Sequence, residues 1–286
     1  MAGGIIVILL IIMAILAPLI VGWLGYDPNA FDKTAIDPAT QQPTSSFPFG
    51  AFDSKHWMGV DLPFGRDIFS RVVYGSRISL LIAFLATLLS VLIGATLGIV
   101  AGFFGGWVDT VISRAMDVFL AFPILVFAIA VAGVIPDKAF GLEGDALRIV
   151  LLIFVIGFFN WAYIARIVRG QALSLREREF VDAARSLGAR SGYIIVREML
   201  PNLIAPILVY ATLLIPSNIL FEAALSFLGV GVRPPTATWG GMLSDAVHYY
   251  TTPHIMFWPG MAIFVTVLAF NLFGDGLRDA LDPKNR

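Results

Sequence analysis

The sequence contains no cysteine and little charge. Charged residues make up only 14% of its 286 residues. A chain without cysteine has no disulfide bond, no thiol nucleophile and no thiolate metal ligand. Because a soluble domain carries about 25% charged residues, most of this chain does not face water. Together with a hydrophobic content of 58%, this predicts an integral membrane protein with several spans.

Several catalytic and binding signatures are also missing. The dipeptide Gly-Lys never occurs, which excludes the phosphate-binding loop of P-loop ATPases. There is no His-Glu-x-x-His zinc motif, and the three histidines lack the close spacing of metal ligands. A net charge of −1 offers no basic face to nucleic acid. We therefore expect no catalytic residue, no metal site, no nucleotide and no nucleic acid bound by this chain.

Long apolar stretches recur along the chain. An α-helix needs about 20 apolar residues to cross the hydrocarbon core of a bilayer. The stretches that meet or approach this length are residues 5–24, 78–104, 118–135, 149–165, 203–221 and 255–273. The first lacks the charged start and small-residue cleavage site of a signal peptide. We expect an all-α integral membrane protein with six transmembrane helices.

Basic residues indicate the orientation, because cytoplasmic loops carry an excess of arginine and lysine. The arginines after the fourth stretch are Arg166, Arg169, Arg176, Arg178, Arg185, Arg190 and Arg197. Arg114, expected in a loop between the second and third stretches, and Arg278, Lys284 and Arg286 belong to the same side. This places both termini in the cytoplasm, although the opposite loop, residues 25–77, also carries basic residues.

The pattern divides the chain into two parts. Residues 1–77 comprise the first transmembrane helix, an extracytoplasmic loop and a short helix over residues 66–77. Residues 78–286 form a five-helix core. The apolar stripe of the short helix consists of Ile68, Phe69, Val72 and Val73. This stripe predicts a helix lying along the membrane surface, and a helix that merely precedes the second span is an equally good interpretation.

The segment 171–202 has helical features although it cannot lie in lipid. Each of its arginines would cost about 2.5–3.5 kcal/mol at the centre of a span. Ser174 and Glu177 form a capping box, which predicts a helix that begins near Leu175. The apolar stripe of this helix comprises Phe180, Ala184 and Leu187.

The same segment contains the signals for a turn and a second helix. Gly188 is placed to end the first helix in the left-handed conformation. Ser191 is placed to cap a second short helix, and Leu200-Pro201 leads into the fifth span. The small side chains of Ala183 and Ala184 allow another backbone to approach closely. We predict a cytoplasmic helix–turn–helix that docks into a groove on a soluble partner.

Several motifs resemble a known family. Asp182-Ala183-Ala184, Gly188 six residues after the acid and Pro201 thirteen after the glycine resemble the EAA loop of ABC-importer permeases. Other motifs resemble the C-type subunit of the dipeptide, oligopeptide and nickel permease family. They are Gly59-Val60-Asp61, Gly65-Arg66-Asp67, Ser70-Arg71, Gly75-Ser76-Arg77, Leu225-Ser226-Phe227-Leu228-Gly229, Pro234-Pro235, Trp239-Gly240 and residues 274–283. The chain departs from the family pattern in Asp182 for glutamate, in Val60 for threonine and in lacking a basic N-terminal tail.

The resemblance implies the transmembrane domain of a type I ABC importer (MetI-like), which works by alternating access in the bacterial cytoplasmic membrane. Its implied partners are a second related permease subunit, cytoplasmic ATPase subunits that bind ATP and Mg²⁺, an extracytoplasmic peptide-binding protein and membrane lipid. The implied solute is a short peptide, with a nickel chelate or glutathione as alternatives.

The resemblance also implies which residues couple the chain to the ATPase. They are Glu179, Asp182, Ala183, Ala184, Gly188, Arg190, Leu200 and Pro201. Of these, Glu179 and Arg190, like the neighbouring Arg185, fit a solvated rim equally well.

Polar residues in or near the spans are the remaining candidates. An acid inside a membrane is costly, so Glu222 is a candidate for the solute pathway or a subunit interface, unless it reaches water at the end of its span. Asn160, Asn218 and Ser226 are candidates of the same kind, with hydrogen bonds between helices as the alternative. Mid-span acids also occur in ion-driven secondary transporters, which remain a second hypothesis beside a membrane scaffold without transport.

Overall fold

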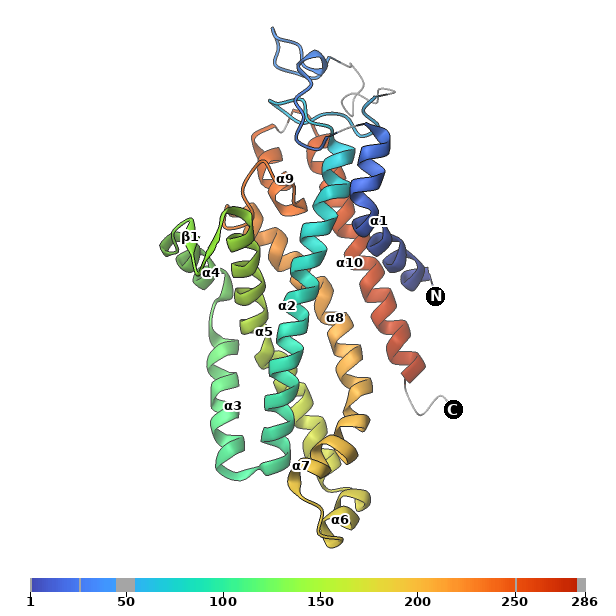
Figure 1. Ribbon diagram of the computed structural model, residues 1–286, viewed down its shortest axis with the longest axis vertical. Coiled ribbons are helices and arrows are strands. Elements are labelled where there is room, and N and C mark those ends of the chain that lie inside the picture. The colour runs from blue at the N-terminus through green and yellow to red at the C-terminus, as the bar shows by residue number, and fades with distance from the viewer. Residues whose placement is uncertain (1, 26, 45–54, 250, 282–286) are drawn as a thin grey trace.

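Long helices lie side by side along the length of the molecule (Figure 1). The computed structural model describes residues 2–25, 27–44, 55–249 and 251–281. The α-helices are α1 (Ala2–Leu24), α2 (Ile68–Phe104), α3 (Gly106–Ala121), α4 (Ile124–Val134), α5 (Gly144–Arg176), α6 (Glu179–Ser186), α7 (Ser191–Tyr193), α8 (Leu200–Phe227), α9 (Trp239–Ala246) and α10 (His254–Leu281). Lys284, Arg286 and the last two residues of the motif at 274–283 lie outside the described residues.

Smaller elements connect these helices. Strands β1 (Lys138–Ala139) and β2 (Leu142–Glu143) form an antiparallel hairpin between α4 and α5. Single 3₁₀ turns occupy Lys33–Ala35 and Val247–Tyr249, and a π-helix occupies Ile194–Met199. The described residues 27–44 and 55–67 lie with α9 at one end of the molecule, here called the loop end, and α6 lies at the other, here called the α6 end (Figure 1).

The membrane spans follow the prediction with one change. Among the described residues, five helices are long and apolar enough to cross a membrane, and the bent pair of α3 and α4 makes six when it counts as one span. The apolar stretch 118–135, expected as the third span, does not form one unbroken helix, because the chain turns by 79° between α3 and α4. Pro123 lacks an N–H and holds Phe122 in an extended conformation, which breaks the helix there. Arg114, expected in a loop, lies within α3.

The predicted helix along the membrane surface is also wrong. Asp67 caps α2 by accepting a hydrogen bond from the Ser70 amide at 2.7 Å, and α2 runs without a break from Ile68 to Phe104. The stripe residues Ile68 and Val72 pack against α9 and α10 in the protein interior. The apolar stripe therefore faces a core, and the alternative of a helix that leads into the second span is confirmed.

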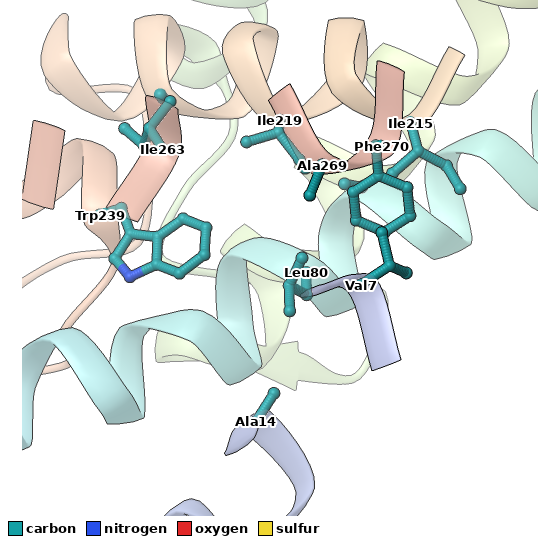
Figure 2. Close-up of a cluster of buried hydrophobic side chains, with 11 residues drawn as sticks. Val7, Ala14, Leu80, Ile215, Ile219, Trp239, Ile263, Ala269 and Phe270 are labelled. Atoms are coloured by element: carbon teal, nitrogen blue, oxygen red, sulfur yellow. The ribbon is translucent and has the colours of Figure 1, made fainter. Parts of the chain in front are cut away.

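The loop end is attached to the bundle by a buried core. Figure 2 shows Val7 of α1, Leu80 of α2, Ile219 of α8 and Phe270 of α10 in this core, together with Trp239 at the start of α9. The Trp239 indole donates a hydrogen bond to the Val72 carbonyl at 2.9 Å. This bond ties α9 to the first turns of α2.

The two described ends of the chain lie close together. Gly3 in the first turn of α1 contacts Leu272 and Phe273 in α10. Arg278, near the end of α10, shares a cleft with Gln171 of α5 and Pro206 of α8, at the α6 end. Both ends of the chain therefore point away from the loop end.

Helices α2 and α5 approach each other backbone against backbone. A Cβ atom at Gly94 would lie 2.6 Å from the Trp161 carbonyl oxygen, and one at Gly98 would lie 2.7 Å from that of Ala165. Gly102 continues the pattern one turn later. Glycine at every fourth residue lets membrane helices meet closely.

Gly98→Ala is expected to destabilise the protein in detergent. The added methyl group meets backbone atoms of α5, so the helices must separate, at a cost of about 1–3 kcal/mol. Thermal unfolding of the purified chain measures this as a lower Tm. Gly170→Ala is the matched control, since a Cβ there meets nothing within 4 Å. Equal Tm values for the two variants would contradict the close packing.

Candidate functional site

Helix α6 begins four residues later than the capping box predicts. Ser174 lies within α5, which continues to Arg176, and α6 starts at Glu179 without a side-chain cap. The Glu177 carboxylate pairs with Nε of Arg176 at 3.0 Å. It therefore does not reach back to the backbone at Ser174, as a capping box requires.

One side of α6 is anchored to the bundle. Val181 is completely buried against Ile194, Met199 and Leu203. The predicted stripe lies elsewhere on the helix, with Phe180 37% exposed and Leu187 88% exposed. The spacing of Phe180, Ala184 and Leu187 is helical, as predicted, but these residues do not anchor α6. Val181 is the anchor, and the sequence analysis missed it.

The end of α6 follows the prediction at Gly188. Its φ of +79° is a left-handed conformation that glycine adopts without steric cost. The Gly188 amide donates to the Arg185 carbonyl at 2.9 Å, and the Ala189 amide donates to the Ala184 carbonyl at 3.0 Å. These two bonds form a Schellman motif.

The predicted cap of the second helix is wrong by one residue. Arg190 occupies the N-cap position without a side-chain hydrogen bond, and Ser191 is the first residue of α7. The Arg190 carbonyl accepts a bond from the Ile194 amide at 3.1 Å. The short helix is therefore set by backbone bonds and not by the serine.

A π-helix joins α7 to α8, so that one continuous helical stretch runs from Ser191 to Phe227. Within it the Leu200 amide bonds to the Ile195 carbonyl, five residues back. Pro201 follows, and in an α-helix its ring would clash with the carbonyl four residues before it, that of Arg197. The wider π turn gives this carbonyl room and carries the chain into α8.

The outward side of α6 presents small residues between larger ones. The exposed residues of α6 and of the turn after it are here called the α6 surface, and they are Glu179, Phe180, Asp182, Ala183, Arg185, Ser186, Leu187 and Gly188. Asp182 pairs with Arg185 at 3.2 Å, and the Arg185 guanidinium lies over the Phe103 ring. Exposed apolar side chains surrounded by charge are typical of a protein–protein contact.

The residues predicted to contact the ATPase differ in how exposed they are. Glu179, Asp182, Ala183, Gly188 and Arg190 are exposed at the α6 end, and Ala184 is half-buried. Leu200 is half-buried in the stretch that leads to α8, whereas Pro201 is exposed. The exposed residues of α6 share one surface, and Leu200 and Pro201 support it from the next helix.

The two asparagines predicted near the pathway are bonded to each other. Asn160 of α5 donates from Nδ2 to Oδ1 of Asn218 in α8 at 2.8 Å. Asn218 donates in turn to the Thr87 hydroxyl of α2 at 2.8 Å. Hydrogen bonds between helices thus account for the buried Asn218, and Thr87 is a partner that the sequence did not single out.

Glu222 and Ser226 lie in the interior of the chain near the loop end. The Ser226 hydroxyl donates to Oε1 of Glu222 at 2.8 Å. Both side chains are buried, so Glu222 does not reach water at the end of its span. Thr238, the N-cap residue of α9, adjoins the same carboxyl group. This pair therefore lies where α8 meets the start of α9.

The motif residues before α2 form buried ion pairs at the loop end. Asp61 accepts from Nε of Arg66 at 2.7 Å and lies 3.5 Å from Nε of Arg71. Nearby, hydrogen bonds from the Thr34 side chain and amide lower the pKa of Asp32 to about 2. Among the described residues, no group of three or more histidine, aspartate or glutamate side chains could hold a metal ion.

Comparisons with known proteins agree with this geometry. The family model described as binding-protein-dependent transport system inner membrane component matches residues 94–286. The chain is 41% identical to the dipeptide transport system permease protein DppC of Alkalihalophilus pseudofirmus over 283 residues, 99% of this chain and 84% of that protein. It is also 41% identical to the glutathione transport system permease protein GsiD of Pectobacterium atrosepticum, over 99% of this chain and 86% of that protein.

A solved structure shares the fold. Inward-facing MetNI methionine ABC transporter matches with a TM-score of 0.61 over 75% of this chain and 98% of that chain. The sequence identity of 17% means that this likeness concerns the fold alone. The predicted MetI-like all-α fold is confirmed.

Gly188→Ala is expected to loosen the end of α6. A side chain in the left-handed conformation costs about 1 kcal/mol, so the amides of residues 184–190 should exchange with deuterium about fivefold faster. Hydrogen exchange followed by mass spectrometry measures this. Gly192→Ala is the control, because Gly192 lies in α7 and a Cβ there meets nothing within 4 Å. Unchanged exchange in Gly188→Ala would contradict the role of the Schellman motif.

Proposed function

Because the chain belongs to the family of binding-protein-dependent transport system inner membrane components, we propose that it forms one half of the pathway of an ATP-driven importer of short peptides. The single observation that carries the coupling role is the α6 surface, which is exposed at one end of a membrane-spanning bundle and anchored by Val181. The sequence has no phosphate-binding loop, so ATP hydrolysis belongs to separate ATPase subunits.

The coupling role follows from how α6 is attached. Val181 packs on Ile194 and Met199, which belong to the stretch that continues into α8, while α6 itself follows α5. An ATPase that moves the α6 surface therefore moves the ends of both helices. Alternating access results when this motion is repeated in a second related permease subunit across the pathway.

Two similar relatives support a peptide as solute. The names of DppC and GsiD concern a dipeptide and glutathione, and the chain is equally identical to both. An extracytoplasmic binding protein would deliver the solute to the loop end, where the described residues 27–44 and 55–67, together with α9, are available for contact.

The hypothesis of an ion-driven secondary transporter rests on Glu222, and it has little support. Glu222 is completely buried and bonded to Ser226, at the junction of α8 with α9. A coupling ion needs a carboxylate that can be reached from one side of the membrane at a time. The scaffold hypothesis does not account for the exposed α6 surface or for the family.

The α6 end is assigned to the cytoplasm because of its arginines, and single cysteines test this. The chain has no native cysteine, so an introduced one gives the only thiol signal. Ser186→Cys at the α6 end should react with a membrane-impermeant maleimide in inside-out vesicles, and Thr40→Cys at the loop end should react only in right-side-out vesicles. The reverse pattern would contradict the orientation, including the cytoplasmic termini.

Ala183→Arg is expected to abolish binding of the ATPase. Ala183 is exposed on the α6 surface, so arginine there leaves the fold intact but puts an unpaired charge into the contact. We expect at least about a tenfold loss of ATPase that co-purifies with the detergent-solubilised permease. Ala30→Arg is the matched control, because Ala30 is exposed at the loop end.

The control variant should retain the ATPase at the level of the wild type. If Ala183→Arg and Ala30→Arg bind it equally, α6 is not the main docking element, and the proposed coupling role fails. If the wild type binds no ATPase at all, the assignment of the partner fails as well.

A further inference from the structure

Three polar side chains from three helices form a chain of hydrogen bonds in the middle of the bundle. The Thr87 hydroxyl of α2 donates to the Ala83 carbonyl at 2.8 Å. Asn218 of α8 donates to the Thr87 hydroxyl, and Asn160 of α5 donates to Asn218, each at 2.8 Å. Thr87 and Asn160 lie near the midpoints of α2 and α5, so the chain of bonds lies about halfway across the membrane.

The direction of these hydrogen bonds determines which acceptor atom at the end of the chain receives no bond. A hydroxyl group has one proton, and Thr87 gives it to a backbone carbonyl, so its oxygen must accept from the Asn218 amide. The Asn218 carbonyl oxygen then accepts from the amide of Asn160. The carbonyl oxygen Oδ1 of Asn160 is the end of the chain, and within the described residues no hydrogen bond reaches it.

The free end of this chain lies at the surface of the bundle. Thr87 and Asn218 are buried, whereas Asn160 is only half-buried. Along α5, the exposed residues Tyr163 and Arg166 follow Asn160 at intervals of three residues toward the α6 end, and the Arg166 guanidinium pairs with Asp117 of α3 at 2.6 Å. The polar stripe thus begins at mid-depth and continues along one helix face.

Lipid does not suit this face of α5. The exposed large side chains of α1 are all apolar, namely Ile5, Ile8, Leu9, Ile12, Ile15, Leu16, Leu19 and Trp23. Such a surface faces hydrocarbon at no cost, whereas exposed amide and guanidinium groups within a span turn toward water or protein. This face of α5 is therefore better suited to water or protein than to lipid.

We propose that Oδ1 of Asn160 binds the solute, by accepting a hydrogen bond from an N–H group of a short peptide halfway across the membrane. The inference rests on the proposed function, because it takes the polar face of α5 as the wall of the pathway. Thr87 and Asn218 are positioning residues, which hold the carboxamide of Asn160 in place before the solute arrives. A neutral acceptor binds an N–H group weakly enough to release it, as transport requires.

The test uses the complete importer, with its binding protein and ATPase, reconstituted in vesicles and supplied with ATP. The probe is radiolabelled dialanine. Asn160→Leu removes the acceptor, and we expect uptake at low dialanine concentration to fall about fivefold, the effect of one lost hydrogen bond. Thr96→Val is the matched control, since Thr96 is exposed on α2 but gives its hydroxyl proton to the Leu92 carbonyl of its own helix, and the change should leave uptake unchanged.

Asn160→Ala serves as a second variant, in case leucine obstructs the pathway, and should show the same loss. The amounts of second permease and ATPase that co-purify should equal those of the wild type in all three variants.

Unchanged uptake in both Asn160 variants overturns the inference, as does a loss of the second permease, which would make Asn160 a subunit contact. An equal loss in Thr96→Val also overturns it. Failure of the proposed function is seen separately, as absence of ATP-dependent dialanine uptake by the wild type.

Discussion

Helices α2 and α5 lie backbone against backbone because glycine occupies every fourth position of α2 where α5 crosses it. Gly94, Gly98 and Gly102 leave no room for a Cβ atom, and Gly157 of α5 does the same for α2. The Ser90 hydroxyl, which donates to the Gly157 carbonyl at 2.9 Å, adds a bond across this contact. The positions of Asn160 in α5 and of Thr87 in α2 are both set by this contact.

The contact between α2 and α5 is connected to the α6 end by two arginines. Nη1 of Arg176, the last residue of α5, lies 3.4 Å from the Gly102 carbonyl oxygen. Arg185 of α6 lies over Phe103, the next residue of α2. Val181 fixes the other side of α6 to the stretch that becomes α8. In the proposed coupling, a displacement of α6 would reach α5 and α8, the two helices that carry Asn160 and Asn218.

The sequence predicted some of the features that depend on local backbone conformation. Gly188 needs only its own left-handed conformation to end α6, so the spacing found it correctly. The Ser174 capping box is also local, but it failed because α5 continues to Arg176 and Glu177 pairs there instead. Pro123 within the apolar stretch 118–135 was a visible signal for a break. An amphipathic stripe at Ile68 and Val72 cannot distinguish a core from a membrane surface, since both are apolar.

The sequence did not predict which distant side chains form hydrogen bonds with one another. Asn160, Asn218 and Glu222 were identified as polar residues in apolar stretches, but nothing in the sequence indicated that Asn160 bonds Asn218 or that Thr87 completes the chain. The row of glycines at 94, 98 and 102 was readable as a helix-packing motif. This motif predicts that another helix packs closely against this face of α2.

We propose that a separate ATPase drives this chain through α6. The most direct measurement is uptake of a labelled dipeptide by vesicles that contain the complete importer, with ionophores that remove both the proton and the sodium gradient. Uptake that persists with ATP under these conditions is the result predicted here. Uptake that stops when the gradients collapse, while ATP remains present, would contradict it.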